Sequence, residues 1–278
     1  MGCCGLTSIV VAQDNPKYDS RDNCNAIIET QSNKLVSGCS KTIIPNNVVS
    51  IGVGAFKGNL SWLTSIVIPN SVMSIGRSAF SGCWSLSSIN IPDGVVSIED
   101  STFYGCSSLT SVEIPNSVVS IGDLAFQECF SLASVILRQG LESIGQQAFC
   151  DCSSLTSIEI PNSVTSIGDS AFYDCSGLTM VVIPNSVTSI GGSAFMDCSG
   201  LVMVTIGSSV ESIGDEAFAN CNKLEEIYAL SRIAVVCNEN VFSSTAYRNV
   251  VLYVPEGREF AYERTVPWCN FYILPIPT

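Results

Sequence analysis

The residues of this chain best able to do chemistry are its cysteines and its carboxylates. The 278-residue sequence has 14 cysteines, 25 acidic residues and no histidine. The lack of histidine excludes Ser-His-Asp triads, Cys-His dyads and histidine-ligated metal sites. No glycine-rich phosphate loop, nucleophile elbow or paired-carboxylate motif occurs at an informative spacing. We therefore expect neither a catalytic centre nor a cofactor.

Most of the cysteines share one position in a repeat. Their side chains would all point into the same core, so we expect free, buried thiols that act as small hydrophobic groups. The Cys150-Asp151-Cys152 cluster offers too few ligands for structural zinc. The cysteines at the shared position are Cys3, Cys83, Cys106, Cys129, Cys152, Cys175, Cys198 and Cys221.

Two further cysteines, Cys24 and Cys39, are the best disulfide candidates. The segment between them alternates polar and apolar residues around a polar turn at residues 30–33, which predicts a projecting β-hairpin. The simplest register places Glu29 opposite Lys34 and Cys24 opposite Cys39. Whether the Cα separation and side-chain angle allow a bond stays open.

Four carboxylates also recur in step, two residues after successive phenylalanines. Glu128, Asp151, Asp174 and Asp197 form this acidic ladder, and Asn220 follows them. At ~5 Å spacing in water, each neighbouring pair costs about 0.8 kcal/mol, which a divalent cation such as calcium would relieve. In the alternative, which we favour, each carboxylate accepts hydrogen bonds from its own turn and is otherwise solvated.

The cysteine and carboxylate ladders belong to one repeat, which is marked by eight phenylalanines. They stand 23 residues apart with a single 24-residue exception. A unit this short cannot enclose a core of its own, so such units must stack into a solenoid. The phenylalanines are Phe56, Phe80, Phe103, Phe126, Phe149, Phe172, Phe195 and Phe218.

Each unit contains two strand-like pieces. In the unit that starts at Leu109, residues 111–114 alternate with period two, and residues 118–121 form a second extended piece. Pro115-Asn116 predicts a turn between them, and Gly122 allows the next corner. Ala-Phe-x-x-Cys then closes the coil as a short 3₁₀ or single helical turn.

The whole chain, residues 1–278, is predicted to be one solenoid domain of about nine coils. Residues 1–41 would hold a truncated first coil and the hairpin, and residues 42–229 the regular repeats. Residues 230–278 would cap the open end of the core, with a strand at 250–254 and a helix at 255–264.

The outward position of the first strand varies from coil to coil, unlike its neighbours. Near the C-terminal end, the residues at and around it predict a partly apolar patch. Such a patch either contacts a partner or packs beneath the terminal cap, and both alternatives stay open. The patch residues are Met180, Val182, Val202, Met203 and Tyr228.

The repeat is similar to a known family. Residues 160–178, IPNSVTSIGDSAFYDCSGL, resemble the Treponema pallidum-type leucine-rich repeats of BspA-like surface proteins. Residues 15–29 look like the elaborated unit of Bacteroides members, and residues 252–257, LYVPEG, look like their closing unit. The resemblance implies a right-handed leucine-rich-repeat solenoid at the cell surface. It also implies adhesion to host matrix proteins or to other bacteria, the roles reported for relatives, and no catalytic residues.

Charge and hydropathy further restrict the classes of partner that the chain can bind. The net charge of −13 disfavours nucleic acids and anionic lipid surfaces, and no apolar run approaches the ~20 residues of a membrane span. The chain opens on Met-Gly-Cys-Cys without a signal peptide, so a secreted or cell-surface location rests on the resemblance.

We expect a non-enzymatic adhesion module whose sheet face and hairpin contact a protein or glycan. The alternatives are a structural spacer that displays another domain and, third, a glycan-acting enzyme.

Overall fold

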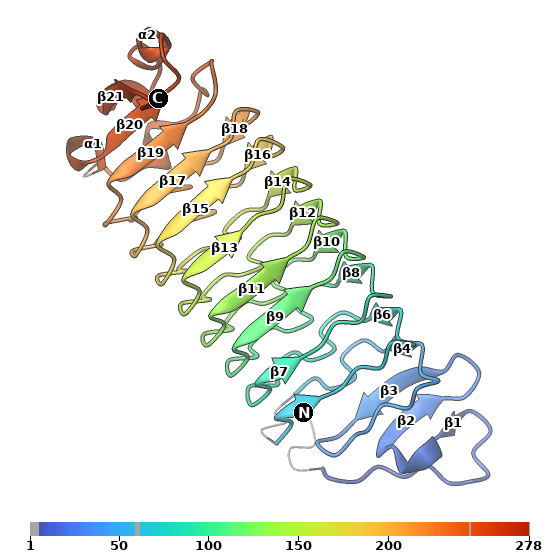
Figure 1. The fold of residues 1–278 in the computed structure, drawn as a ribbon. Coiled ribbons are helices and arrows are strands. Elements are labelled where there is room, and N and C mark those ends of the chain that lie inside the picture. The colour runs from blue at the N-terminus through green and yellow to red at the C-terminus, as the bar shows by residue number, and fades with distance from the viewer. Residues whose placement is uncertain (1–5, 59–61, 245, 278) are drawn as a thin grey trace.

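The computed structural model describes residues 6–58, 62–244 and 246–277, and it forms an elongated solenoid (Figure 1). Successive coils stack side by side from the hairpin at one end to a cap of short helices and strands at the other. Cys3 and the opening Met-Gly-Cys-Cys lie outside the described residues.

One row of parallel strands carries the first strand-like piece of each coil. It is divided into a four-stranded sheet, β11-β9-β7-β5, and a six-stranded sheet, β13-β15-β17-β19-β20-β21. The strands are β5 Ser65–Ile66, β7 Ser88–Ile89, β9 Ser111–Ile114, β11 Ser134–Leu137, β13 Ser157–Glu159, β15 Met180–Ile183, β17 Met203–Ile206, β19 Glu226–Ala229, β20 Val251–Val254 and β21 Tyr272–Pro275.

The second row carries the shorter Ser-Ile pieces, each of two residues. The even-numbered strands from β8 to β18 form one sheet, and β4 and β6 continue the row in a five-stranded sheet with the strands of the N-terminal hairpin. These strands are β4 Ser50–Ile51, β6 Ser74–Ile75, β8 Ser97–Ile98, β10 Ser120–Ile121, β12 Ser143–Ile144, β14 Ser166–Ile167, β16 Ser189–Ile190 and β18 Ser212–Ile213.

The period-two pattern sets which side chains enter the core. In β9, Val112 and Ile114 are buried while Ser111 and Glu113 are exposed. Equivalent residues pair across coils, since Val135 of β11 lies opposite Val112. Each buried apolar residue therefore lies against the equivalent apolar residue of the next coil. The prediction of two strands in each unit is confirmed.

Tight turns connect the strands as the sequence predicted. The Val118 N–H donates to the Pro115 carbonyl at 3.1 Å, and the Cys129 N–H donates to the Phe126 carbonyl at 3.2 Å. Leu124 and Glu128 adopt left-handed conformations with φ of 60° and 61°. The Ala-Phe-x-x-Cys segment is therefore a series of tight turns closed by i→i+3 hydrogen bonds, because left-handed residues interrupt any continuous helix.

The phenylalanines form one continuous stack through the core. All eight are buried, and Phe242 extends the column by one more ring. Neighbouring ring centroids lie 5.0 to 5.5 Å apart with nearly parallel planes. A single hydrophobic cluster includes this stack and runs from Cys24 to Phe271.

The C-terminal cap closes the stack with edge-on aromatic rings. Trp268 and Phe271 contact Phe242 at centroid distances of 5.6 and 5.2 Å, and the Trp268 Nε1–H donates to the Val235 carbonyl at 2.7 Å. The predicted strand is β20, but the predicted helix at 255–264 is reduced to one turn, α2. The short helices are η1 Arg21–Asn23, η2 Glu239–Val241, α1 Ala246–Asn249, α2 Glu259–Tyr262 and η3 Trp268–Asn270.

The N-terminal hairpin is formed by β2 (Ala26–Glu29) and β3 (Lys34–Gly38), with β1 (Tyr18–Asp19) at its edge. The prediction that it projects is wrong. Strand β3 pairs in parallel with β4, and the apolar inner side chains of the hairpin are buried in the common core. The hairpin is therefore the N-terminal cap of the solenoid.

The predicted hairpin register holds near the turn and fails at the open end. Glu29 lies opposite Lys34 as predicted, but a bulge after Ile27 places Ala26 opposite Gly38. The bulge shifts the strands by one residue, so the facing register expected for Cys24 and Cys39 is wrong. Both are buried, free thiols, and the Cys39 thiol donates to the Asn25 carbonyl at 3.3 Å.

Candidate binding surface

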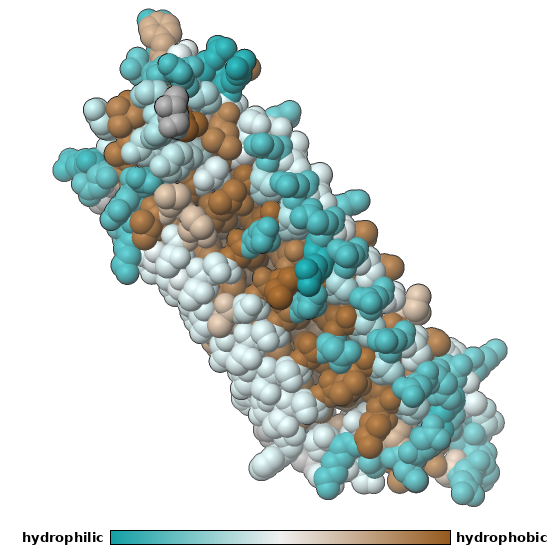
Figure 2. All heavy atoms as spheres, in the orientation of Figure 1, coloured by the Kyte–Doolittle hydropathy of each residue, from teal (hydrophilic) through white to brown (hydrophobic). Residues whose placement is uncertain are grey.

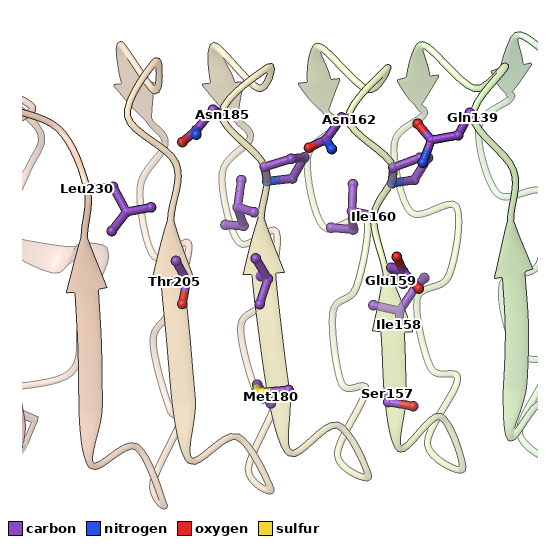
Figure 3. Close-up of a pocket in the computed structure, with 14 residues that line it drawn as sticks. Gln139, Ser157, Ile158, Glu159, Ile160, Asn162, Met180, Asn185, Thr205 and Leu230 are labelled. Atoms are coloured by element: carbon purple, nitrogen blue, oxygen red, sulfur yellow. The ribbon is translucent and has the colours of Figure 1, made fainter. Parts of the chain in front are cut away.

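A shallow groove of about 560 Å³ crosses the outer face of β13, β15 and β17 (Figure 3). Its floor is made by outward side chains of these strands, and its rim by the turns that follow them. The floor holds Ser157, Glu159, Met180, Val182 and Thr205, and the rim holds Gln139, Asn162, Asn185 and Leu230.

Strand register positions the floor of the groove. Ser157 lies opposite Met180 and Glu159 opposite Val182 in the β13–β15 pair. Val182 lies in turn opposite Thr205 of β17. Because alternate residues of a strand share one face, these side chains form two rows that run along the solenoid axis.

The floor exposes apolar side chains on rigid backbone. Met180 is 48% exposed and Val182 is 47% exposed. Figure 2 shows hydrophobic residues as a stripe along this row of strands, bordered on one side by hydrophilic residues. Exposed apolar groups next to a polar rim are typical of contact surfaces.

The rim carries side-chain amides held by Pro-Asn turns. The Asn185 Oδ1 accepts hydrogen bonds from the Ser208 N–H at 2.8 Å and from the Ser208 Oγ at 3.1 Å. Those bonds orient the Asn185 side chain and leave its amide N–H groups available. The exposed Asn162 holds the same place one coil earlier. Amides at this spacing suit peptide groups or sugar hydroxyls.

Two glutamates on the outward row differ in their partners. The Glu113 carboxylate forms an ion pair with Arg138, with Oε1 2.9 Å from Nε and 2.6 Å from the terminal nitrogen. One coil beyond Glu159, Pro184 occupies the position equivalent to Arg138. No described residue forms a salt bridge with Glu159, so the groove holds an uncompensated carboxylate.

The sequence-predicted patch is only partly inside the groove. Met180 and Val182 line it, whereas Val202 and Met203 lie beside it and are half-buried. The Tyr228 ring stacks on Tyr253 of β20 at a centroid distance of 4.7 Å. Tyr228 therefore packs against the cap, while Met180 and Val182 remain open to solvent.

Sequence reasoning missed the polar half of the groove. Glu159 and Thr205 stand at the variable outward position of the first strand, and Asn162 and Asn185 stand at the turn position of Asn116, so residue type alone marks neither pair as a site. The signal that could have found them is the register itself, because turns 23 residues apart must lie side by side in a solenoid.

The backbone conformation explains why aspartate recurs at the position of the acidic ladder. Asp151, Asp174 and Asp197 have φ of 61°, 49° and 61°, and in earlier coils Gly82 and Gly105 hold the same left-handed position. Aspartate and asparagine tolerate this region better than most residues. Burial, then the charges of Asp151 and Asp197, raises the pKa of Asp174. Among the described residues, no group of three or more acidic or cysteine side chains is placed to hold a metal ion.

The cysteine ladder acts as predicted, as buried free thiols. From Cys83 to Cys221, each thiol of the ladder donates to the carbonyl of the phenylalanine one coil earlier, as Cys129 does to Phe103 at 3.4 Å and Cys198 to Phe172 at 3.1 Å. Burial raises the pKa of Cys129 to about 12, which keeps it protonated and unreactive.

The stacked coils, parallel strands and phenylalanine column define a leucine-rich-repeat solenoid. A family model described as the BspA type leucine-rich repeat region matches residues 28–153 and 119–249, with six copies. The chain belongs to this BspA-type family. A search of curated proteins finds no match.

Solved structures of bacterial leucine-rich-repeat proteins share the fold. The Treponema pallidum leucine-rich repeat protein is 27% identical, with a TM-score of 0.57, 78% of this chain covered and 91% of that one. A leucine-rich repeat protein of Eubacterium ventriosum is 25% identical, with a TM-score of 0.61, 69% of this chain covered and 52% of that one. The pneumococcal vaccine antigen PcpA is 20% identical, with a TM-score of 0.58, 87% of this chain covered and 65% of that one.

Within the described residues, every helix is too short or too polar to cross a membrane.

Proposed function

We propose that this chain is a non-enzymatic binding module of the cell surface, which holds a protein or glycan partner in the groove over β13, β15 and β17. The observation that carries the proposal is the exposed floor of Met180 and Val182, set on paired strands and framed by side-chain amides. Paired strands hold such a surface without loop ordering on binding, which lowers the entropy cost of association.

The chemistry around the groove favours binding over catalysis. Glu159 is the one carboxylate that lines the groove among the described residues, so acid and base groups do not converge there as a glycan hydrolase requires. BspA-type membership supports a role in contact between surfaces, and the use of the similar protein PcpA as a vaccine antigen supports surface display.

A binding screen tests the proposal. The chain is presented to arrays of matrix proteins and glycans, and capture is repeated with Met180→Lys and Met203→Lys. A charge on the contact surface should weaken capture at least about tenfold, since an apolar contact is replaced by a desolvated ammonium.

The matched control is Met73→Lys. Met73 is 56% exposed and lies beside the second row of strands. Its substitution should leave capture unchanged. Capture that survives Met180→Lys would contradict the groove as the contact surface, whereas Met203 only borders the groove. No specific capture by any variant would favour the structural spacer.

A further inference from the structure

We infer that the groove takes an extended, cationic segment of a protein partner, with a lysine or arginine head group on Glu159 and its aliphatic stem over Val182. The inference rests on the proposed function and specifies its partner.

The charge of the surrounding coils favours a cation. Residues 139–222 contain nine acidic residues and neither lysine nor arginine. The basic residue that precedes Glu159 in the chain is Arg138 of the adjoining coil, and its guanidinium is paired with Glu113. An acidic surface of this kind attracts basic segments and repels polyanions.

The chain itself contains the pairing that the groove lacks. Arg138 reaches back one coil to hold the carboxylate of Glu113 at 2.6 Å. Pro184 occupies the same place relative to Glu159 and offers no charge. A guanidinium or ammonium group from a partner would complete the equivalent ion pair.

The side chains around Glu159 suit the stem of a long basic residue. Glu159 lies opposite Val182, and Ile136 holds the same outward position one coil earlier. Val182 is 47% exposed and Ile136 is 43% exposed. Lysine and arginine bury their methylene groups on apolar surface while the charged head reaches a polar group. The amides of Asn162 and Asn185 can then bond the main chain of an extended segment.

Peptide binding tests the inference. Fluorescein-labelled octapeptides of alternating Lys-Val, Gln-Val and Glu-Val are titrated with the intact chain, and anisotropy gives each Kd. The Lys-Val peptide should bind at least about tenfold more tightly than the Gln-Val peptide, as a charge-assisted contact predicts. Equal binding of these two peptides would overturn the inference.

Variants locate the contact. Glu159→Gln should weaken Lys-Val binding about tenfold, whereas Glu142→Gln, which removes the same charge beside β12, should change it less than twofold. Pro184→Arg should block the peptide by pairing with Glu159 internally, and Pro184→Gln should not. Thermal melting confirms that each variant folds. Equal effects of Glu159→Gln and Glu142→Gln would overturn the inference.

The two proposals fail separately. If Met180→Lys abolishes capture in the array screen while Glu159→Gln leaves capture and peptide binding intact, the groove binds a partner that is not cationic. If a neutral glycan is the ligand that Met180→Lys removes, the cationic inference is again overturned and the proposed function stands. If neither substitution affects capture, both proposals are wrong.

Discussion

The ring of Phe56 lies directly against Gly38, where the phenylalanine stack meets the N-terminal hairpin. A β-carbon on Gly38 would lie 2.6 Å from the Phe56 Cζ and closer still to Cε1. Gly38 thus lets β3 approach the first ring of the stack and seal it, as Trp268 and Phe271 seal the other end.

Gly38→Ala should therefore lower the free energy of unfolding by about 1–3 kcal/mol, because the added methyl group overpacks the contact. Urea unfolding measures the change. Gly192→Ala is the control, since its β-carbon would meet nothing closer than 3.4 Å. Equal stability of the two variants would refute a tight seal at Gly38.

The phenylalanine stack should be costly to interrupt in the middle. Phe149 is fully buried between Phe126 and Phe172, at centroid distances of 5.3 and 5.4 Å. Phe149→Ala should cost about 3–5 kcal/mol, and Phe149→Leu distinctly less because it leaves a smaller cavity. Calorimetry compares the two, and similar melting temperatures would mean that the ring is not part of the core.

The left-handed position two residues after each phenylalanine predicts a substitution pattern. Gly105 has φ of 66°, and an alanine there would meet no close neighbour. Gly105→Ala should thus cost about 1–2 kcal/mol through backbone strain alone, and Gly105→Asn clearly less. The melting temperatures of the two variants decide this, and an unchanged value for Gly105→Ala would contradict the strain.

The acidic ladder predicts a pH effect of known sign. Because burial and the neighbouring carboxylates raise the pKa of Asp174 above its unfolded value, its charge weakens the fold at neutral pH. The penalty is lost as the pH falls through the folded pKa. Asp174→Asn should raise stability at pH 7 by less than about 1 kcal/mol, because the ladder is partly exposed. The gain should vanish in acid, and urea unfolding at pH 7 and below pH 4 measures both. A gain that persists below pH 4 would exclude the carboxylate charge as its cause.

A thiol-reactive reagent should distinguish the buried core cysteines from the exposed Cys269. Cys269 is exposed, whereas Cys129 and Cys198 are fully buried. Iodoacetamide followed by peptide mass mapping should label Cys269 in the native protein, and the core cysteines only after unfolding. Labelling of Cys129 at the rate of Cys269 would show that the coils open readily.

Much of the fold could be predicted because each coil repeats the same pattern of buried and exposed residues. The spacing of the phenylalanines predicts the stack, and the alternation in residues 111–114 predicts the buried face of β9. The hairpin could not be placed, because alternation predicts a strand pair without saying which strand it joins. The bulge after Ile27 has no sequence signal, and it removes the facing register of Cys24 and Cys39.

The sequence predicted the apolar residues of the groove but not its carboxylate. Met180 and Val182 stand out as apolar residues at outward positions, so composition alone marks them. Glu159 can be recognised as unpaired only by comparison with the next coil. Pro184 stands there at the position from which Arg138 pairs with Glu113, and proline carries no charge. Which side chains of neighbouring coils lie side by side depends on the strand register, and the sequence of a single strand does not give that register.

Site-specific photocrosslinking tests the central claim most directly. A photoreactive amino acid replaces Val182 on the outward face of β15 or, as the control, Val119 beside β10, where the side chain is 45% exposed. The chain is then irradiated with the partner captured in the array screen. We predict crosslinks from position 182 and none from position 119. Crosslinks from position 119 alone, or from neither, would contradict the groove as the contact surface.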